Sequence, residues 1–405
     1  MLSQYKGLRR ENYILAFGRL VSGLGSMVWP MLTLILSQKM GVGPKQISWI
    51  ISLSMVLMVP AIFAGGKAAD RWNKKSIILF LDVVSAVCYI VCAAIRMSWM
   101  TICLMFLGSL CQNSSNPAYS ALTADLSRTE DRERVFSLQY LCANLGLALA
   151  PTVAGLLFQN HLWLVFLING VSISCSALLL FFLIQDTTPI QEETVLAVYQ
   201  KERSGDSLWN VLKENRVIIL YMIAVCGYYA TYQMYVYLMP LDLAAAHGAN
   251  GPVIYGSVTS LNCLVVVLFT PIITRLFTRM SEPDKSVTAE SLLLAGFIMF
   301  YIFLGHVPFY YISMTILTWG EIFQMTSESP YFTKRIPSSH RGRINGFFTV
   351  VRTAVASLYQ LLLGAVYAGS GSRAAWLTVF GIGLCFVLLA VITRFRDRRD
   401  YPNLY

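Results

Sequence analysis

The chain has 405 residues, of which 56% are hydrophobic and 13% are charged. Soluble domains carry about a quarter of charged residues, so this composition excludes an ordinary soluble protein and predicts a polytopic membrane protein. The net charge of +10 does not require a nucleic-acid partner, because lysines and arginines placed in loops explain it as membrane topology. All nine cysteines lie within apolar runs, which predicts small packing residues and neither a disulfide, a metal site nor a cofactor.

Apolar runs long enough to cross a bilayer recur along the chain and predict twelve transmembrane helices. Helices are the expected element, because the alternating pattern of barrel strands is missing. The first run lacks a small-residue cleavage site, so we expect a retained span and not a signal peptide. The predicted spans are Asn12–Ser37, Gln46–Ala64, Ser76–Ile95, Trp99–Leu122, Val135–Phe158, Leu162–Ile184, Val217–Leu241, Val253–Phe277, Ala289–Gly305, Phe309–Phe332, Ile344–Ala368 and Ala374–Arg394.

Lysines and arginines gather on one side of this topology. Of the 31, only Lys39, Lys45, Arg96 and Arg373 fall on the opposite side, and Arg19 and Arg352 lie in the interior of spans. Positive charge favours the cytoplasm, so both termini are predicted to be cytoplasmic. The longest segment between spans, residues 185–216, is polar and mixed in charge. It predicts a cytoplasmic linker between two six-helix halves, residues 1–184 and residues 217–405 with a short cytoplasmic tail.

The two halves look like one repeat. Proline-containing positions recur at an offset of about 210 residues, and two arginine pairs follow the same offset, which indicates related bundles. The matched positions are Pro30 and Pro240, Gly43-Pro44 and Gly251-Pro252, Pro60 and Pro271, and Arg132/Arg134 and Arg341/Arg343.

A short, strongly charged loop follows the second span. It reads Gly66-Lys-Ala-Ala-Asp70-Arg71-Trp-Asn-Lys74-Lys75, and its charges predict a cytoplasmic turn between antiparallel helices. Its spacing resembles the signature loop of the major facilitator superfamily, which lies between the second and third helices, although that loop usually has glycine where this chain has Asn73. The resemblance covers essentially the whole chain. It implies an all-α membrane protein with twelve transmembrane helices in two pseudo-symmetric six-helix bundles.

The resemblance also implies a latch that locks one conformation. In the family the loop aspartate docks on the start of span 11, which here assigns Asp70 to Arg341 and Arg343, with Asp125 and Arg134 as the equivalent pair before span 5. Gly146-Leu-Ala-Leu-Ala-Pro151 is similar to the antiporter motif, with alanines in place of two glycines. Gly320-Glu321, Pro337 and Arg341-Gly-Arg343 are similar to the bacterial drug/proton antiporter branch, but span 4 lacks the arginine of many such exporters.

Ionisable side chains inside spans are candidate functional residues, because a charge there is costly. The candidates are Arg19, Asp82, Glu321, Glu328 and Arg352. Glu321 lies about 20 Å along a helix from Lys334, near the membrane midplane, so we expect it to carry the coupling proton, with Glu328 as a second candidate. Glu328 and Arg352 lie at similar depth and could form a structural or gating ion pair. Arg19 and Asp82 could pair in the same way.

Uncharged polar side chains outline a substrate cavity. Span 4 carries Gln112, Asn113 and Asn116, and span 7 carries Tyr228, Tyr232, Gln233 and Tyr235. The resemblance implies that spans 1, 4, 7 and 10 line the cavity, which adds Arg19. Such a wall suits amphipathic, aromatic or cationic ligands. Helix packing or an interfacial belt is the alternative explanation of the tyrosines.

The preferred function is proton-coupled efflux of a small amphipathic molecule, of the multidrug type, by a monomeric transporter in the cytoplasmic (inner) membrane of a bacterium. Uptake or facilitated diffusion of a metabolite or lipid is the alternative, favoured by the altered span-5 motif and the missing span-4 arginine. A non-transporting membrane sensor would be favoured by a large soluble domain. An enzyme is not expected, because the sequence has no nucleophile–base pair, metal cluster or phosphate loop.

Overall fold

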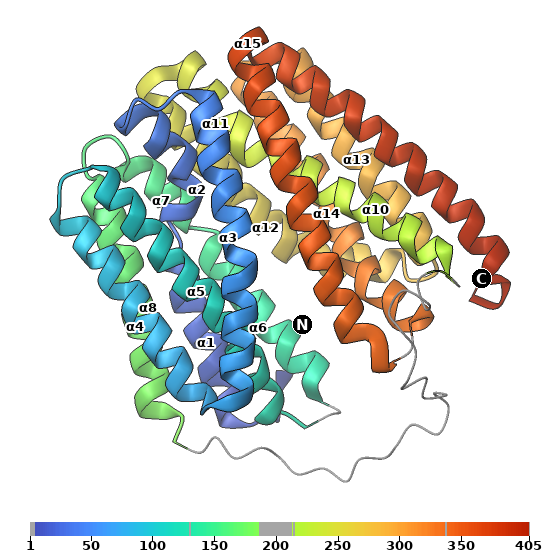
Figure 1. The fold of residues 1–405 in the computed structure, drawn as a ribbon, viewed down its shortest axis with the longest axis horizontal. Helices are drawn as coiled ribbons and strands as arrows, with labels where there is room; N and C mark the ends of the chain where they lie inside the picture. The colour runs from blue at the N-terminus through green and yellow to red at the C-terminus, as the bar shows by residue number, and fades with distance from the viewer. Residues whose placement is uncertain (1–4, 129–130, 186–212, 214, 337, 405) are drawn as a thin grey trace. The chain divides into compact units, whose positions relative to one another are not determined.

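The computed structural model describes residues 5–128, 131–185, 213, 215–336 and 338–404 (Figure 1). Every regular element within these ranges is helical, which confirms the predicted all-α class. Eight helical segments of this part are long and apolar enough to cross a membrane. Two of them run for 61 and 57 residues, more than twice the length of one crossing. The number of crossings stays a prediction, and most of the predicted linker 185–216 lies outside the described residues.

The chain folds into two compact units. Unit 1 comprises Met1–Val42, Leu57–Thr194 and Leu243–Val267, and unit 2 comprises Gly43–Val56, Val195–Asp242 and Leu268–Tyr405. Each unit therefore combines most of one sequence half with a segment of the other half in which a helix begins. The two beginnings, Gly43-Pro44 and Gly251-Pro252, are positions that the repeat pairs with each other.

Unit 1 is a bundle of helices, and local capping fixes the starts of α4 and α5. Asn73, which replaces the glycine of the signature loop, accepts a hydrogen bond from the Ser76 amide and caps α4. Ser98 and Thr101 form a capping box at the start of α5. The helices of this unit are α1 (Arg10–Gly25), α2 (Val28–Leu34), the π-helix η2 (Ile35–Lys39), most of α3 (Pro44–Arg71), α4 (Lys74–Ala94), α5 (Trp99–Asp125), α6 (Arg132–Leu147), α7 (Ala150–Leu157), α8 (Leu162–Leu183), the 3₁₀ turn η4 (Gly248–Asn250) and the first part of α12 (Gly251–Leu276).

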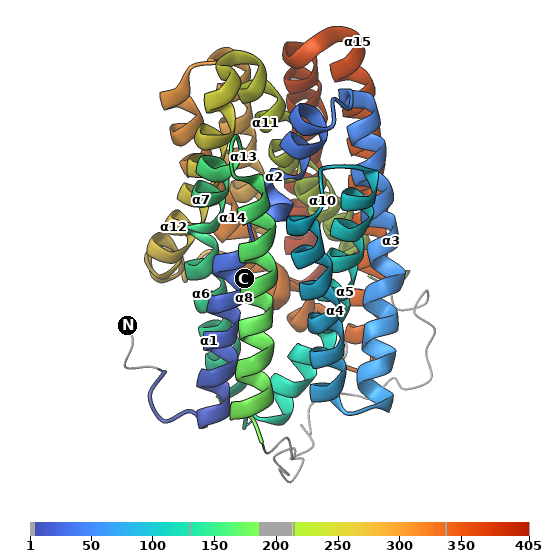
Figure 2. The same ribbon diagram turned by 90° about the vertical axis from the view of Figure 1, so that its left-hand side faces the viewer.

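Within unit 1, α1 packs against α6 and α8, and α4 packs against α5 and α8 (Figure 2). Leu15, Ile78 and Leu122 meet in a buried cluster between these helices. The predicted fifth span is broken into α6 and α7, and Pro151 lies in the first turn of α7. Proline fits there because the first helical amides need no partner within the helix.

Unit 2 contains the helices that follow the predicted linker. They are α10 (Arg216–Tyr232), the first part of α11 (Met234–His247), the last part of α12, α13 (Glu282–Ile302), α14 (Val307–Arg335), α15 (Ser338–Asp400) and the 3₁₀ turn η5 (Pro402–Leu404). The first part of α3 also belongs to this unit. α13 packs against α14 and α15, and α10 packs against α15. Gly371, at φ 78°, interrupts α15, so this segment is two helices joined at a turn.

Two predicted span limits in unit 2 are wrong. The predicted span Ala289–Gly305 belongs to a helix that already begins at Glu282, because the Ser281 hydroxyl accepts a hydrogen bond from the Asp284 amide. The predicted seventh span, Val217–Leu241, is not continuous, since α10 ends at Tyr232 and α11 begins at Met234.

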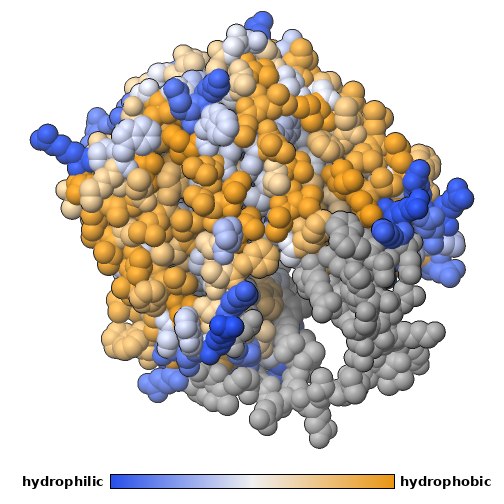
Figure 3. Space-filling model, in the orientation of Figure 1, coloured by the Kyte–Doolittle hydropathy of each residue, from blue (hydrophilic) through white to orange (hydrophobic). Residues whose placement is uncertain are grey.

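Large apolar side chains are exposed on these helices. Phe80 is 68% exposed and Leu276 is 71% exposed. Figure 3 shows apolar residues over much of the face in view. Extended apolar surface of this kind is expected where helices face lipid hydrocarbon.

α1 and α6 approach closely at two glycines. A Cβ atom at Gly146 would lie 2.4 Å from the Leu20 carbonyl oxygen and 2.9 Å from the Gly23 Cα atom. Small residues permit such close helix contacts in membranes. We therefore expect Gly146→Ala to lower the free energy of unfolding by about 1–3 kcal/mol, measured by thermal unfolding in detergent.

Gly381→Ala is the matched control, because nothing lies within 4 Å of a Cβ atom at this helical glycine. Alanine is the better helix former, so this control should be neutral or stabilising by up to about 1 kcal/mol. Equal stability of the two variants would contradict the proposed tight contact.

Candidate functional site

A row of tyrosines and two carboxylates lies in unit 2. The Tyr228 and Tyr232 rings stack with centroids 6.1 Å apart, and the Tyr232 and Tyr235 rings meet edge to face at 5.1 Å. Tyr228 and Tyr235 are buried, with 1% and 6% exposure. Gln233, in contrast, is exposed at the bend between α10 and α11. The three tyrosines of the predicted stripe therefore contact one another in a row, and Gln233, predicted beside them, lies outside it.

Glu321 and Glu328 on α14 each accept a hydrogen bond from a tyrosine of α10. The Tyr232 hydroxyl donates to Glu321 Oε2 at 2.7 Å, and the Tyr229 hydroxyl donates to Glu328 Oε2 at 2.8 Å. Both glutamates are half-buried. Each carboxylate therefore sits between an apolar helix interface and a phenol donor, an arrangement in which a proton can be bound or released.

Arg352 lies beside the pair formed by Tyr229 and Glu328. Its guanidinium carbon is 4.5 Å from the centroid of the Tyr229 ring, and it interacts electrostatically with Glu328. Glu328 and Arg352, which were predicted to pair, thus meet around Tyr229. A cation over a phenol whose hydroxyl binds a carboxylate stabilises all three groups.

Glu290 on α13 is a candidate that the sequence-based set missed. Its side chain is 2% exposed, and its Oε1 atom has no hydrogen-bond partner among the described residues. The residue lies at the second position of the predicted span Ala289–Gly305, where an ionisable group costs little. Because α13 begins at Glu282, Glu290 is two turns inside the helix. The capping signature at Ser281 could have revealed this depth.

A second polar cluster lies in unit 1. Asp82, which is 4% exposed, accepts hydrogen bonds from the Ser115 hydroxyl at 3.0 Å and the Tyr119 hydroxyl at 2.7 Å. The Arg19 guanidinium carbon lies 4.2 Å from the centroid of the Tyr119 ring. Arg19 also donates to Asn116 Oδ1 at 3.0 Å. The predicted Arg19–Asp82 pairing is therefore mediated by Tyr119.

Arg19, Asp82, Ser115 and Tyr119 line a cavity of about 20 Å³, which is room for one water molecule. Gln112 lines the cavity beside Arg19 and Asp82. Asn113 instead bonds within its own helix, since its amide donates to the Ser109 carbonyl at 2.8 Å. Of the three amides predicted on span 4, Gln112 and Asn116 thus reach the charged cluster, and Asn113 is bonded along α5.

The predicted latch residues have other described partners. Lys74 pairs with Asp125 at 2.5 Å, and Arg134 pairs with Asp131 at 2.6 Å. Lys75 donates to the carbonyls of Phe181 and Ile184 at the end of α8, where the helix dipole favours a cation. Asp125 and Arg134 thus each have a described partner, Lys74 and Asp131 respectively.

Of the remaining latch residues, the structure describes the surroundings of Arg71 and Gly66. Arg71 is exposed, and a Cβ atom at Gly66 would meet only Pro117, at 3.8 Å. The side chains of Asp70, Arg341 and Arg343 lie outside the described part of the structure.

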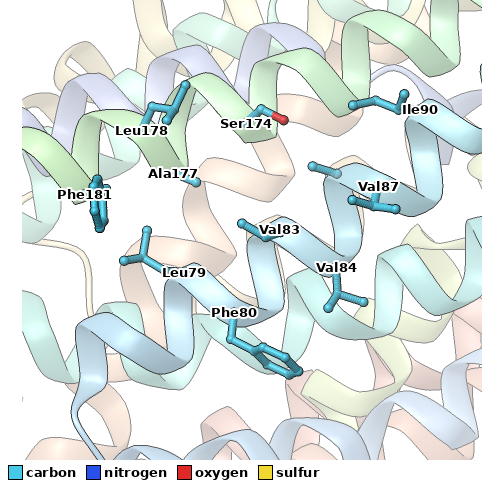
Figure 4. Close-up of a pocket in the computed structure, with 11 residues that line it drawn as sticks. Leu79, Phe80, Val83, Val84, Val87, Ile90, Ser174, Ala177, Leu178 and Phe181 are labelled. Atoms are coloured by element: carbon cyan, nitrogen blue, oxygen red, sulfur yellow. The ribbon is translucent and has the colours of Figure 1, made fainter.

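An apolar groove of about 580 Å³ lies between α4 and α8 (Figure 4). Phe80, Val83, Val87 and Leu178 line it, and Ser174 is its polar lining residue. None of the predicted site residues reaches this groove. Its composition fits contact with lipid chains, not recognition of a polar substrate.

The family of the chain is shown by comparison with known proteins. A model described as Major Facilitator Superfamily matches residues 15–359. The chain belongs to the major facilitator superfamily. This confirms the predicted family and its all-α membrane fold, while the twelve spans and the two six-helix halves stay predictions. Membership makes the protein a multi-pass membrane transporter of small molecules and not an enzyme.

Relatives within the superfamily are distant. The sequence is 24% identical to a "Na(+), Li(+), K(+)/H(+) antiporter" of Planococcus maritimus, over 93% of this chain and 94% of the relative. It is 20% identical to "Tetracycline resistance protein, class H" of Pasteurella multocida, over 94% of both chains. A solved POT family transporter in complex with 5-aminolevulinic acid has a TM-score of 0.81 at 14% identity, with 96% of both chains covered. The structural likeness supports the fold alone.

Proposed function

We propose that this transporter is a proton-coupled antiporter that exports a small amphipathic molecule by alternating access. The observation that carries the proposal is the half-buried Glu321 carboxylate, hydrogen-bonded to Tyr232 within a row of stacked phenol rings. An ionised Glu321 attracts a cationic or polarisable substrate to this aromatic face. A proton on the same carboxylate removes that attraction. Proton and substrate therefore compete for one site, which is the requirement for exchange.

The relatives support this direction of coupling. One carries "antiporter" in its name and another "Tetracycline resistance". We assign Glu328 and Arg352 to a gating pair around Tyr229, and Arg19, Gln112 and Asn116 to substrate contact in unit 1. Asn113 and Gln233 remain secondary candidates for the same role.

The membrane arrangement is part of the proposal. We place a monomer in the cytoplasmic membrane of a bacterium, with both termini inside and two six-helix halves, 1–184 and 217–405. The latch pairs Asp70 with Arg341 and Arg343, because a carboxylate is stabilised by a helix N-terminus and by neighbouring arginines. Gly66 and Arg71, at the end of α3, and Lys74 and Lys75, at the start of α4, are the other residues of the signature segment. Asp125 and Arg134 form the equivalent site before α6.

Transport by purified protein in liposomes tests the proposal. We expect an imposed pH gradient, with the compartment opposite the proposed cytoplasmic side acidic, to drive accumulation of ethidium or tetracycline. A protonophore should abolish accumulation, because it removes the coupling ion. Movement of these probes that ignores both treatments would instead support facilitated diffusion.

Monovalent cation/proton exchange is a second candidate. The match to the cation antiporter over 93% of this chain favours it, as does the presence of a further buried carboxyl group, Glu290. The same liposomes distinguish the candidates. Addition of NaCl, LiCl or KCl should collapse a stored pH gradient, followed with acridine orange, if metal cations are the exchanged substrate.

A further inference from the structure

Glu290 is the most deeply buried acidic group at the α13–α14 contact, and the proposed function does not use it. It lies eight residues, or about 12 Å, from the first residue of α13. Its side chain is 2% exposed, and Oε1 has no hydrogen-bond partner among the described residues. A group of this kind needs an explanation, because buried polar atoms are normally satisfied.

The backbone places Glu290 next to the helical turn that carries Glu321. A Cβ atom at Gly320 would lie 2.7 Å from the Ala289 carbonyl oxygen and 3.4 Å from the Leu293 amide nitrogen. α13 and α14 therefore touch at the residues that directly precede the two glutamates. The absence of a side chain at Gly320 is what permits this approach.

Tyr228 of α10 completes the cluster. It is 1% exposed, and its hydroxyl has no hydrogen-bond partner among the described residues. It interacts electrostatically with both Glu321 and Glu290, and its ring stacks on Tyr232, the donor to Glu321. Two buried oxygen atoms without hydrogen-bond partners in the described part of the chain, Tyr228 Oη and Glu290 Oε1, thus flank the proposed coupling carboxylate from two different helices.

An ionised Glu290 would be strongly unfavourable here. A charge out of water needs a counter-charge or several donors, and two buried or half-buried arginines of this unit are engaged with other groups. Arg352 lies over Tyr229, and Arg335 is bound by Asp397. A bound proton is the simplest way to neutralise the group, since a buried metal ion would require several more oxygen ligands.

We propose that Glu290 binds a proton of its own behind Glu321, and that Tyr228 couples the two carboxyl groups. Glu321 exchanges its proton with solvent, while Glu290 stays neutral when Glu321 is ionised, because two adjacent carboxylates repel each other. The coupling part rests on the proposed role of Glu321. Proton binding by Glu290 does not, and it can be measured without any transported substrate.

Infrared spectroscopy of the purified full-length protein at neutral pH provides the test. Protonated carboxyl groups have a carbonyl stretching band separate from that of carboxylates, and labelling with ¹³C-carboxyl glutamate assigns it to glutamate. We expect this band in the wild type and a loss of its intensity in Glu290→Gln, because one of the protonated glutamates is removed. Glu282→Gln is the matched control on the same helix, because Glu282 pairs with Lys334 at 2.5 Å and is ionised. A band that keeps its full wild-type intensity in Glu290→Gln would overturn the proposal.

Two further measurements complete the test. Tyr228→Phe and Glu321→Gln should each shift the frequency of the carbonyl band of Glu290. An unchanged frequency in both variants would overturn the proposed coupling of Glu290 to Glu321. Tyr228→Phe leaves both carboxyl groups in place, so the test survives if Glu290→Gln does not fold. Loss of the wild-type band on adding NaCl or LiCl at constant ionic strength would assign the site to a metal cation and overturn proton binding. Loss of gradient-driven transport alone would leave the Glu290 assignment intact.

Discussion

Replacing Glu321 with glutamine is expected to reduce gradient-driven accumulation of the transported probe by about 5- to 150-fold. That range is the usual size of a coupling free energy of about 1–3 kcal/mol between two ligands. Glutamine keeps the shape of the side chain and an oxygen that can accept the Tyr232 hydroxyl, which donates to Glu321 at 2.7 Å in the wild type. It cannot bind or release a proton, so coupling is lost while the fold is kept. The measurement is probe accumulation in liposomes under an imposed pH gradient.

Substrate–substrate exchange without a gradient separates loss of coupling from loss of binding. Glu321→Gln should still exchange labelled for unlabelled probe, because that process needs no proton. Tyr232→Phe should have a smaller effect, since it removes one donor and keeps the carboxylate. Glu282→Gln changes the first residue of α13, away from the proposed coupling site, and this variant should transport normally. Gradient-driven accumulation that persists in Glu321→Gln would show that the coupling proton binds elsewhere.

Much of the fold was predictable because membrane helices are specified locally. Each apolar run must satisfy its own backbone in lipid, so length and hydropathy alone predict a helix. The limits of the helices depended on finer signals. α13 begins at Glu282 and not near Ala289, because Ser281 caps it. The sequence gives no comparable signal for the bend at Gln233 between α10 and α11, since neither glycine nor proline stands there.

The contacts of the candidate site were only partly predictable. Depth along a helix follows from residue counting, which predicted Glu328 and Arg352 at the same level, and in the structure both contact Tyr229. The rotation of each helix about its axis is set by packing between distant segments, which the sequence does not state. That is why Tyr229 between those two residues, and Tyr119 between Arg19 and Asp82, were not expected. Glu290 was missed for two reasons. Its depth in α13 depends on the Ser281 cap, and its burial depends on the close contact of α13 with Gly320.

A buried ion pair in unit 2 had no signal in the sequence, and it gives the largest expected effect on stability. Arg335 Nη2 lies 2.6 Å from Asp397 Oδ2, and Arg335 Nε donates to Asp397 Oδ1 at 2.9 Å, with both side chains fully buried. The Tyr331 hydroxyl also donates to Asp397, at 2.8 Å. The pair joins α14 to the last turns of α15, which continue to Asp400, beyond the predicted end at Arg394.

Asp397→Asn should lower the free energy of unfolding by about 3 kcal/mol, the lower end of the usual cost of breaking a buried ion pair. It removes the nearer counter-charge of the buried Arg335 guanidinium and leaves Glu282 Oε2, 3.6 Å from Arg335 Nη1, as the more distant partner. Asp284→Asn is the control. Asp284 pairs with Arg394 and Arg398, whose side chains are 33% and 45% exposed, and solvent-screened pairs contribute about 1 kcal/mol or less. Thermal unfolding in detergent, followed by circular dichroism, measures both.

The double variant Arg335→Met/Asp397→Leu distinguishes an unpaired charge from a packing defect. Apolar replacement of both partners removes the desolvation penalty together with the attraction, and in other proteins it is often neutral or stabilising. We therefore expect the double variant to recover most of the stability that Asp397→Asn loses. Recovery would show that Asp397→Asn loses stability because the buried Arg335 guanidinium has lost its nearer carboxylate partner. A double variant no more stable than Asp397→Asn would mean that the contacts of Tyr331 and Tyr401 with Arg335, with ring centroids 4.0 and 5.4 Å from its guanidinium carbon, hold these helices together instead.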